Sequence, residues 1–200
     1  MLISNQDIMT NARSQLKGKW GAVILVAFIY LLILILVETI TKIGEIITLI
    51  ISGPLAYGLN YYFLSFIRQK ETSLEDLFKG ISVFGKAFIT TMFMAFFVIL
   101  WTLLLIVPGA IAAISYSMTF FILIDNPEIY GKDAIKKSKE LMRGNKYKFF
   151  CLLLRFLGWF LLSILSLGIG FLWLIPYFKV SHAKFYESLI NPDTNQSVSK

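Results

Sequence analysis

The chain is poor in the residues from which most active sites are built. Its 200 residues include one cysteine, Cys151, and one histidine, His182. A single cysteine excludes an internal disulfide and a cysteine-rich metal site, and a lone histidine lacks the companions that a zinc or catalytic site needs. The sequence has no HExxH, CxxC or GxSxG motif and no glycine-rich phosphate loop followed by a basic residue. We therefore expect neither an enzyme nor a cofactor.

Charge is also scarce. Charged residues make up 16% of the chain and apolar residues 57%, with 18 phenylalanines, whereas a soluble domain is about a quarter charged. That much apolar surface cannot be hidden inside one water-soluble core of this length. The composition predicts an integral membrane protein.

The basic residues are unevenly placed along the chain. Seventeen of the 19 Lys and Arg residues lie in the stretches 1–19, 68–86, 132–148 and 179–200, and the apolar blocks between them hold only Lys42 and Arg155. Positive connections stay in the cytoplasm, so we expect both termini there. The net charge of +7 flanks apolar spans instead of lining one solvated face. We therefore expect anionic lipid headgroups as the partner, and not nucleic acid.

Six apolar segments approach the length of about 20 residues that a helix needs to cross about 30 Å of hydrocarbon. The predicted fold is an all-α, polytopic membrane helix bundle of three hairpins, each preceded by a short amphipathic interfacial helix. The expected spans are 20–37, 46–67, 87–107, 109–124, 149–167 and 168–180; the hairpin units cover about 12–68, 73–124 and 132–190 of a single domain, 1–190, before a flexible polar tail, 191–200.

Two of the hairpins turn without a charged residue, at Pro108-Gly109 and around Gly168 and Gly170. The second span of each is short, so a re-entrant loop is the alternative to a full crossing. Both arrangements keep the flanking basic stretches in the cytoplasm, and the sequence leaves the choice open.

The three units repeat one theme: an amphipathic stretch, a glycine with basic neighbours, an apolar helix, a break at Pro or Gly, and a second apolar helix. The breaks are expected at Gly53-Pro54, at Pro108-Gly109, and at Gly168, Gly170 and Pro176. Recurrence in a fixed order indicates one helical hairpin used three times. Few residues are identical between the copies, so a duplication and convergent membrane patterns both remain open.

The amphipathic stretches are expected to lie flat at the headgroups, with the apolar side down and the lysines up. Thr72 and Glu75 are spaced as a capping box that begins one such helix. In the third copy one helical face collects Ala134, Ile135, Ser138, Leu141 and Met142. The alternative is a docking surface for a cytoplasmic or membrane protein.

Arg155 is a charged residue deep inside an expected span, where it costs at least about 2.5–3.5 kcal/mol on insertion scales. Its long side chain can carry the guanidinium back to the lipid phosphates. A buried pair with Asp125 and a site for an anionic substrate are the alternatives. The candidate contacts to lipid or an anionic ligand are Arg155, Lys146, Lys148, Lys179 and Lys184.

The triplet Asp125, Asn126 and Pro127 closes the fourth span. Proline restricts Asn126 to an extended conformation and ends the helix. An aspartate at a helix C-terminus opposes the helix dipole, so it needs a compensating role. A turn or cap is expected, and the alternative is an ion pair with Arg155, or with Lys179 and Lys184.

An ordered set of motifs runs through residues 101–190: Pro108-Gly109, Tyr116-Ser117-Met118, Asp125-Asn126-Pro127, Ser138, Leu141-Met142-Arg143-Gly144, Gly158-Trp159, Leu167-Gly168-Ile169-Gly170, Leu172-Trp173, Pro176-Tyr177 and Phe185-Tyr186-Glu187. In these motifs the chain resembles a bacterial integral-membrane family known only as domain of unknown function 975. The resemblance implies a multi-pass protein of the bacterial plasma membrane, most often from Gram-positive organisms, and it implies no reaction, substrate or catalytic residue.

Two functions fit these observations. The first is a non-enzymatic membrane protein that acts through lipids or protein partners in envelope maintenance, stress response or protection against antimicrobial peptides. The second is a small permease or lipid transporter, which the repeats and the Pro and Gly breaks favour. Against the permease, no Asp or Glu lies inside an expected span.

Overall fold

The computed structural model describes residues 4–40 and 44–191, and every regular element in that part of the chain is helical. Lys42 and residues 192–200 of the expected tail lie outside the described residues. The elements are α1 (Asn5–Leu16), α2 (Trp20–Ile40), α3 (Gly44–Ile67), the 3-10 helix η1 (Leu74–Phe78), α4 (Lys79–Ser82), α5 (Phe84–Leu104), α6 (Ile106–Tyr116), α7 (Thr119–Asp125), α8 (Lys132–Leu141), α9 (Lys146–Leu165) and α10 (Phe171–Ile190).

The all-helical prediction is confirmed, but the number of apolar spans differs from the expected six. Five helical segments of the described chain are long and apolar enough to cross a membrane: Trp20–Thr39, Ile47–Ile67, Phe84–Leu104, Ile106–Asp125 and Lys146–Leu165. The fourth consists of α6 and α7 in succession. Most of the expected sixth span, 168–180, forms the first half of α10, which carries Lys179, and the second half carries Lys184 and Glu187. Because of these three charges, α10 is not among the segments that are apolar enough to cross a membrane.

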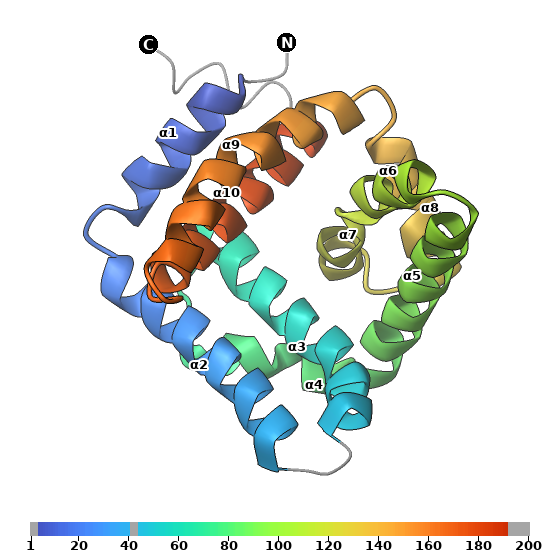
Figure 1. Cartoon of the computed structure of the whole chain (residues 1–200), viewed down its shortest axis with the longest axis horizontal. Coiled ribbons are helices and arrows are strands. Elements are labelled where there is room, and N and C mark those ends of the chain that lie inside the picture. Colours follow the sequence, from blue (N-terminus) through green and yellow to red (C-terminus); the bar gives the residue numbers. More distant parts are fainter. Residues whose placement is uncertain (1–3, 41–43, 192–200) are drawn as a thin grey trace.

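Each of the three units consists of an amphipathic segment and the hairpin that follows it. The amphipathic segment of each unit packs against the hairpin of another unit, so that the three units form a closed cycle. Helix α1 precedes the hairpin α2–α3 but packs against α9 and α10; η1 and α4 precede α5–α6 but pack against α3; α8 precedes α9–α10 but packs against α5, α6 and α7. In Figure 1 the adjoining ends of α2 and α3, the α5–α6 connection and the α9–α10 turn lie at three different edges of the molecule. The recurring theme in the sequence therefore corresponds to a repeated arrangement in space.

The amphipathic helices bury their apolar faces inside the protein, and this corrects the expectation that they lie apolar side down on headgroups. Ile8, Ala12 and Leu16 of α1 are at most 1% exposed. In α8 the expected face is buried, but against α5, α6 and α7, and the Ser138 hydroxyl donates to the Ser115 carbonyl oxygen at 2.9 Å. A narrow stripe of apolar side chains four residues apart fits the groove of a neighbouring helix.

The helix cap and the proline breaks lie partly at other positions than the sequence predicts. The capping interaction of η1 is one residue later than expected, because the Asp76 carboxylate accepts from the Ser73 N–H at 3.0 Å. The expected break at Gly53-Pro54 is wrong, since Pro54 lies inside α3, as Pro176 lies inside α10. Pro108 does mark a break: it stands in the first turn of α6, where its missing N–H costs nothing.

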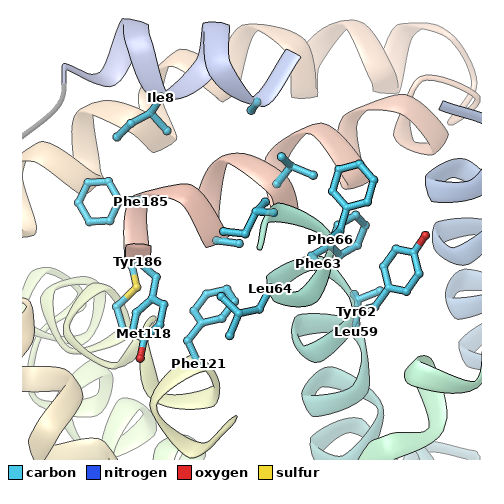
Figure 2. Close-up of a cluster of buried hydrophobic side chains, with 14 of the residues drawn as sticks. Ile8, Leu59, Tyr62, Phe63, Leu64, Phe66, Met118, Phe121, Phe185 and Tyr186 are labelled. Carbon is cyan, nitrogen blue, oxygen red and sulfur yellow. The ribbon is translucent and has the colours of Figure 1, made fainter. Parts of the chain in front are cut away.

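The core forms where the second helices of the three hairpins end. Phe63 of α3, Phe121 of α7 and Phe185 of α10 are fully buried, and Ile8 of α1 is 1% exposed (Figure 2). The Phe121 ring stacks on the ring of Tyr186, with centroids 5.1 Å apart. Because residues from all three units share this cluster, it joins the hairpins at one point.

We expect Phe121→Ala to lower the free energy of unfolding by about 3–5 kcal/mol, because it leaves a cavity at the junction of the three units. Detergent–SDS titration of the purified protein measures this. The matched control is Phe96→Ala, since the Phe96 side chain is 60% exposed. Equal losses for the two variants would show that the junction is not the centre of stability.

Candidate functional site

An ionic cluster lies beside the core and takes one charged residue from each hairpin. The Arg68 guanidinium follows α3 and donates to both carboxylate oxygens of Asp125, at 2.6 and 2.7 Å, and its Nε donates to Glu187 at 2.5 Å. The three side chains are 26%, 22% and 20% exposed. A paired contact of this kind fixes the planes of both groups as well as their distance.

Two further groups complete the cluster. The Tyr186 hydroxyl donates to Asp125 at 2.8 Å, and the Asn191 amide donates to Glu187 at 3.0 Å. Burial raises the pKa of Tyr186, and the hydrogen bond to Asp125 raises it further. Hydrogen bonding to Asp125, and then to Glu187, raises the pKa of Arg68, although burial opposes this. Neither group exchanges a proton near neutral pH, so the cluster acts as a fixed clamp.

The triplet that closes α7 forms a turn held from two sides. Asn126 donates to the Ile122 carbonyl oxygen at 2.9 Å and accepts from Lys137 at 2.5 Å. The Pro127 carbonyl oxygen accepts from Lys86. These contacts tie the end of α7 to α8 and α5. The aspartate of the triplet pairs with Arg68, which the sequence reasoning did not single out.

Arg68 could have been found from the repeat. Arg68, Asp125 and Glu187 each stand near the C-terminal end of the second apolar helix of a hairpin. Charged residues at corresponding positions of the three copies indicate that the ends of these helices meet. Their signs, one positive and two negative, are complementary.

The five candidate contacts do not converge on one site. Arg155 is exposed on α9, and no carboxylate of the described residues lies within 4.0 Å of it. Lys146 and Lys184 are partly exposed, and the Lys148 carbonyl oxygen accepts from Asn5 at 2.7 Å. Lys179 is half-buried, and its ammonium donates to the Asn60 side chain at 3.3 Å.

The glycines of the two uncharged hairpins serve close packing and turning. A Cβ on Gly109 would lie 2.8 Å from the Thr102 Cα, so glycine permits the contact of α6 with α5. A Cβ on Gly170 would lie 2.7 Å from the Ser163 Cα. Gly168 has φ +89° in the α9–α10 turn, a conformation that favours glycine.

His182 is surrounded by aromatic rings. It is 8% exposed, and the rings of Phe121, Phe149 and Phe178 lie 5.0, 5.1 and 5.7 Å from its own. Neither of its nitrogens has a hydrogen-bond partner among the described groups. Residues 4–40 and 44–191 also contain no group of three His, Cys, Asp or Glu side chains placed to hold a metal.

Two cavities flank the α9–α10 hairpin. One, of about 420 Å³, is lined by Arg13, Trp20, Trp159, Trp173 and Tyr177 among others. The other, of about 520 Å³, lies between α2, α3, α9 and α10 and is almost wholly apolar, with Lys179 in its wall. Both volumes are typical of sites for small ligands.

These features define an all-helical protein built from apolar hairpins. Five segments of the described chain are long and apolar enough to cross a membrane. Ion pairs join the C-terminal ends of α3, α7 and α10. The chain belongs to the family described as "Protein of unknown function (DUF975)", whose model matches residues 1–115 and 102–192. This confirms the resemblance seen in the sequence. No curated protein and no solved structure matches the chain.

We expect Arg68→Met to destabilise the protein by about 1–3 kcal/mol, because Asp125 and Glu187 each lose a charged donor. Thermal unfolding in detergent measures the change. Lys70→Met is the matched control, since Lys70 is exposed and makes no ion pair with a described residue. Adding Asp125→Asn to Arg68→Met should cost much less than Asp125→Asn alone; additive losses would show that the two residues are not coupled.

Proposed function

We propose that this protein resides in the bacterial plasma membrane with both termini in the cytoplasm and acts without catalysis, through lipid or protein partners, in envelope maintenance, stress response or protection against antimicrobial peptides. One observation carries the proposal: the exposed turns of α5–α6 and α9–α10 are uncharged, whereas 17 of the 19 basic residues lie in the stretches that flank the apolar segments. The turn of α5–α6 exposes Leu103, Leu104 and Ile106, and the turn of α9–α10 exposes Leu165 and Leu167. Exposed apolar side chains of this kind suit the bilayer, and the basic stretches suit anionic headgroups.

The hairpins differ in depth. Between Lys86 and Asp125 no residue is charged, so each arm of the second hairpin has about 28 Å of uncharged helix, which is enough to cross. Between Arg155 and Lys179 the uncharged stretch is shorter, with arms of about 15 Å, or half of the hydrocarbon thickness. We therefore propose that the third hairpin enters the bilayer from the cytoplasm and returns without crossing.

The turn between α9 and α10 has the chemistry that a turn inside hydrocarbon needs. Every backbone N–H from Ser166 to Leu174 donates to an acceptor within the turn, and the Ser166 hydroxyl accepts from Gly170 at 2.9 Å. Unsatisfied backbone donors would be costly in the bilayer interior. Four crossings and one re-entrant hairpin also keep both termini on the side of the basic stretches.

Cysteine labelling tests this topology. In a Cys151→Ser background, we expect Leu104→Cys to react with an impermeant maleimide on intact cells, because that turn reaches the outer surface. Leu167→Cys should stay unlabelled, and Lys139→Cys on α8 should react only after permeabilisation. Labelling of Leu167→Cys from outside would establish six crossings, and labelling of Lys139→Cys from outside would overturn the orientation.

The second candidate function is a small permease or lipid transporter. The observation that favours it is the apolar cavity of about 520 Å³ beside α10, a helix that contains Pro176. Broken or proline-containing helices line the sites of many carriers. Substrate-specific flux in proteoliposomes that is abolished by filling this cavity would rank transport above the first proposal.

A complementation experiment tests the first proposal. We expect deletion of the gene to alter the lipid profile and to raise sensitivity to cationic antimicrobial peptides severalfold. The wild-type gene should restore resistance. The triple variant Lys136→Gln, Lys139→Gln, Arg143→Gln should fail to do so, because it removes exposed positive charge from α8 and from the turn that follows it. Glu140→Gln is the matched control on the same helix. Unchanged resistance and lipids after deletion would contradict the proposal.

A further inference from the structure

The cavity between α2, α3, α9 and α10 is elongated and has one polar end. Its α10 wall is made by residues on one helical face, from Phe171 near the turn to Lys179 eight residues later, about 12 Å by helical rise. Its α9 wall runs alongside, from Phe160 near the same turn to Leu153. The full lining is Tyr30, Leu59, Leu153, Phe156, Leu157, Phe160, Phe171, Leu174, Ile175, Phe178 and Lys179.

The positive charge at the polar end lacks a negative partner. Among the described residues the Lys179 ammonium has one acceptor, the neutral Asn60 side chain at 3.3 Å, and no carboxylate within 4.0 Å. One turn further along α10, His182 is buried with both ring nitrogens unpartnered. An ammonium held away from water is costly unless an opposite charge accompanies it. A bound anion would supply that charge.

The mouth of the cavity is apolar. Leu157 and Phe160, which line it, are also exposed on the outer face of α9. A ligand that enters there comes from the hydrocarbon of the bilayer. Its anionic end must be small, because Lys179 is the one charged residue of the lining, which apart from Tyr30 is otherwise apolar.

We propose that this cavity binds a single-chain amphiphile with a carboxylate head, such as a free fatty acid, with the chain toward the α9–α10 turn and the carboxylate on Lys179. The inference rests on the membrane location proposed above but not on the proposed cellular role. Lys179 is then at the depth at which the polar headgroups begin, level with the exposed Arg155 of the neighbouring helix. The carboxylate compensates the ammonium, and the acyl chain fills the apolar length.

Binding of radiolabelled palmitate to the full-length protein in phosphatidylcholine nanodiscs tests the proposal. We expect Lys179→Met to weaken palmitate binding at least about tenfold and to leave hexadecanol binding unchanged, because only the acid needs the ammonium. Lys184→Met, on the same helix but outside the cavity, should change neither. Leu157→Trp should abolish binding of both by filling the mouth, whereas Leu161→Trp, exposed on α9 but outside the lining, should not.

Several outcomes would refute the proposed site. Equal affinity of Lys179→Met and wild type for palmitate would refute it, and so would unchanged binding by Leu157→Trp. Competition by phosphatidylglycerol in the nanodiscs as strong as that by unlabelled palmitate would assign the cavity to a phospholipid instead. Thermal unfolding separates binding from folding: Lys179→Met should be at least as stable as wild type, since it removes a half-buried charge that has no negative partner among the described residues. Loss of stability together with loss of binding would make Lys179 a packing residue.

These measurements use purified, reconstituted protein, so they do not depend on the deletion phenotype. A chain that binds palmitate through Lys179 but confers no peptide resistance would refute the proposed cellular role and keep the site. A chain that confers peptide resistance but does not bind palmitate through Lys179 would refute the site and keep the proposed cellular role.

Discussion

The contact on which the rest of the structure depends is the pairing of Arg68 with Asp125 and Glu187. It joins the last turns of three helices that are up to 119 residues apart in the chain. Directly beside it, Phe63, Phe121 and Phe185 form the shared core. Apolar contacts in a lipid environment give helices little reason to prefer one neighbour over another. A bidentate ion pair backed by a buried aromatic cluster selects one arrangement, and the amphipathic helices then close each unit against the next.

Charged and apolar residues are segregated along the chain. The ionic cluster and the turn at Asn126 lie at the ends of α3, α7 and α10, and most of the basic residues flank the apolar segments. The hairpins expose leucine and isoleucine at their turns, and the backbone of the α9–α10 turn is satisfied internally. The basic stretches therefore fit water and anionic headgroups, and the apolar segments fit the bilayer. The apolar cavity ends at the charged Lys179, which corresponds to the polar boundary of an amphiphile.

Much of the fold could be predicted because hydropathy, basic stretches and helical periodicity are local properties. The apolar segments, the buried face of α8 and the turn at Asp125-Asn126-Pro127 all follow from residues close together in the chain. The errors arose where distant contacts outweigh local pattern. Pro54 is accommodated inside a helix, the face of α8 is covered by helices instead of headgroups, and the charged half of α10 is buried against α3 and α9 although its composition indicates an interface.

By itself, the sequence determined that the chain is helical, apolar and asymmetric in charge, and that it contains one motif three times. Only the tertiary structure decided that Arg68 is the partner of Asp125, that Arg155 is exposed whereas Lys179 contacts Asn60, and that an apolar cavity ends at an ammonium group. The physical reason is that hydropathy depends on the composition of a segment, whereas pairing and cavities depend on which helix faces meet. Those faces are set by contacts between residues far apart in the chain.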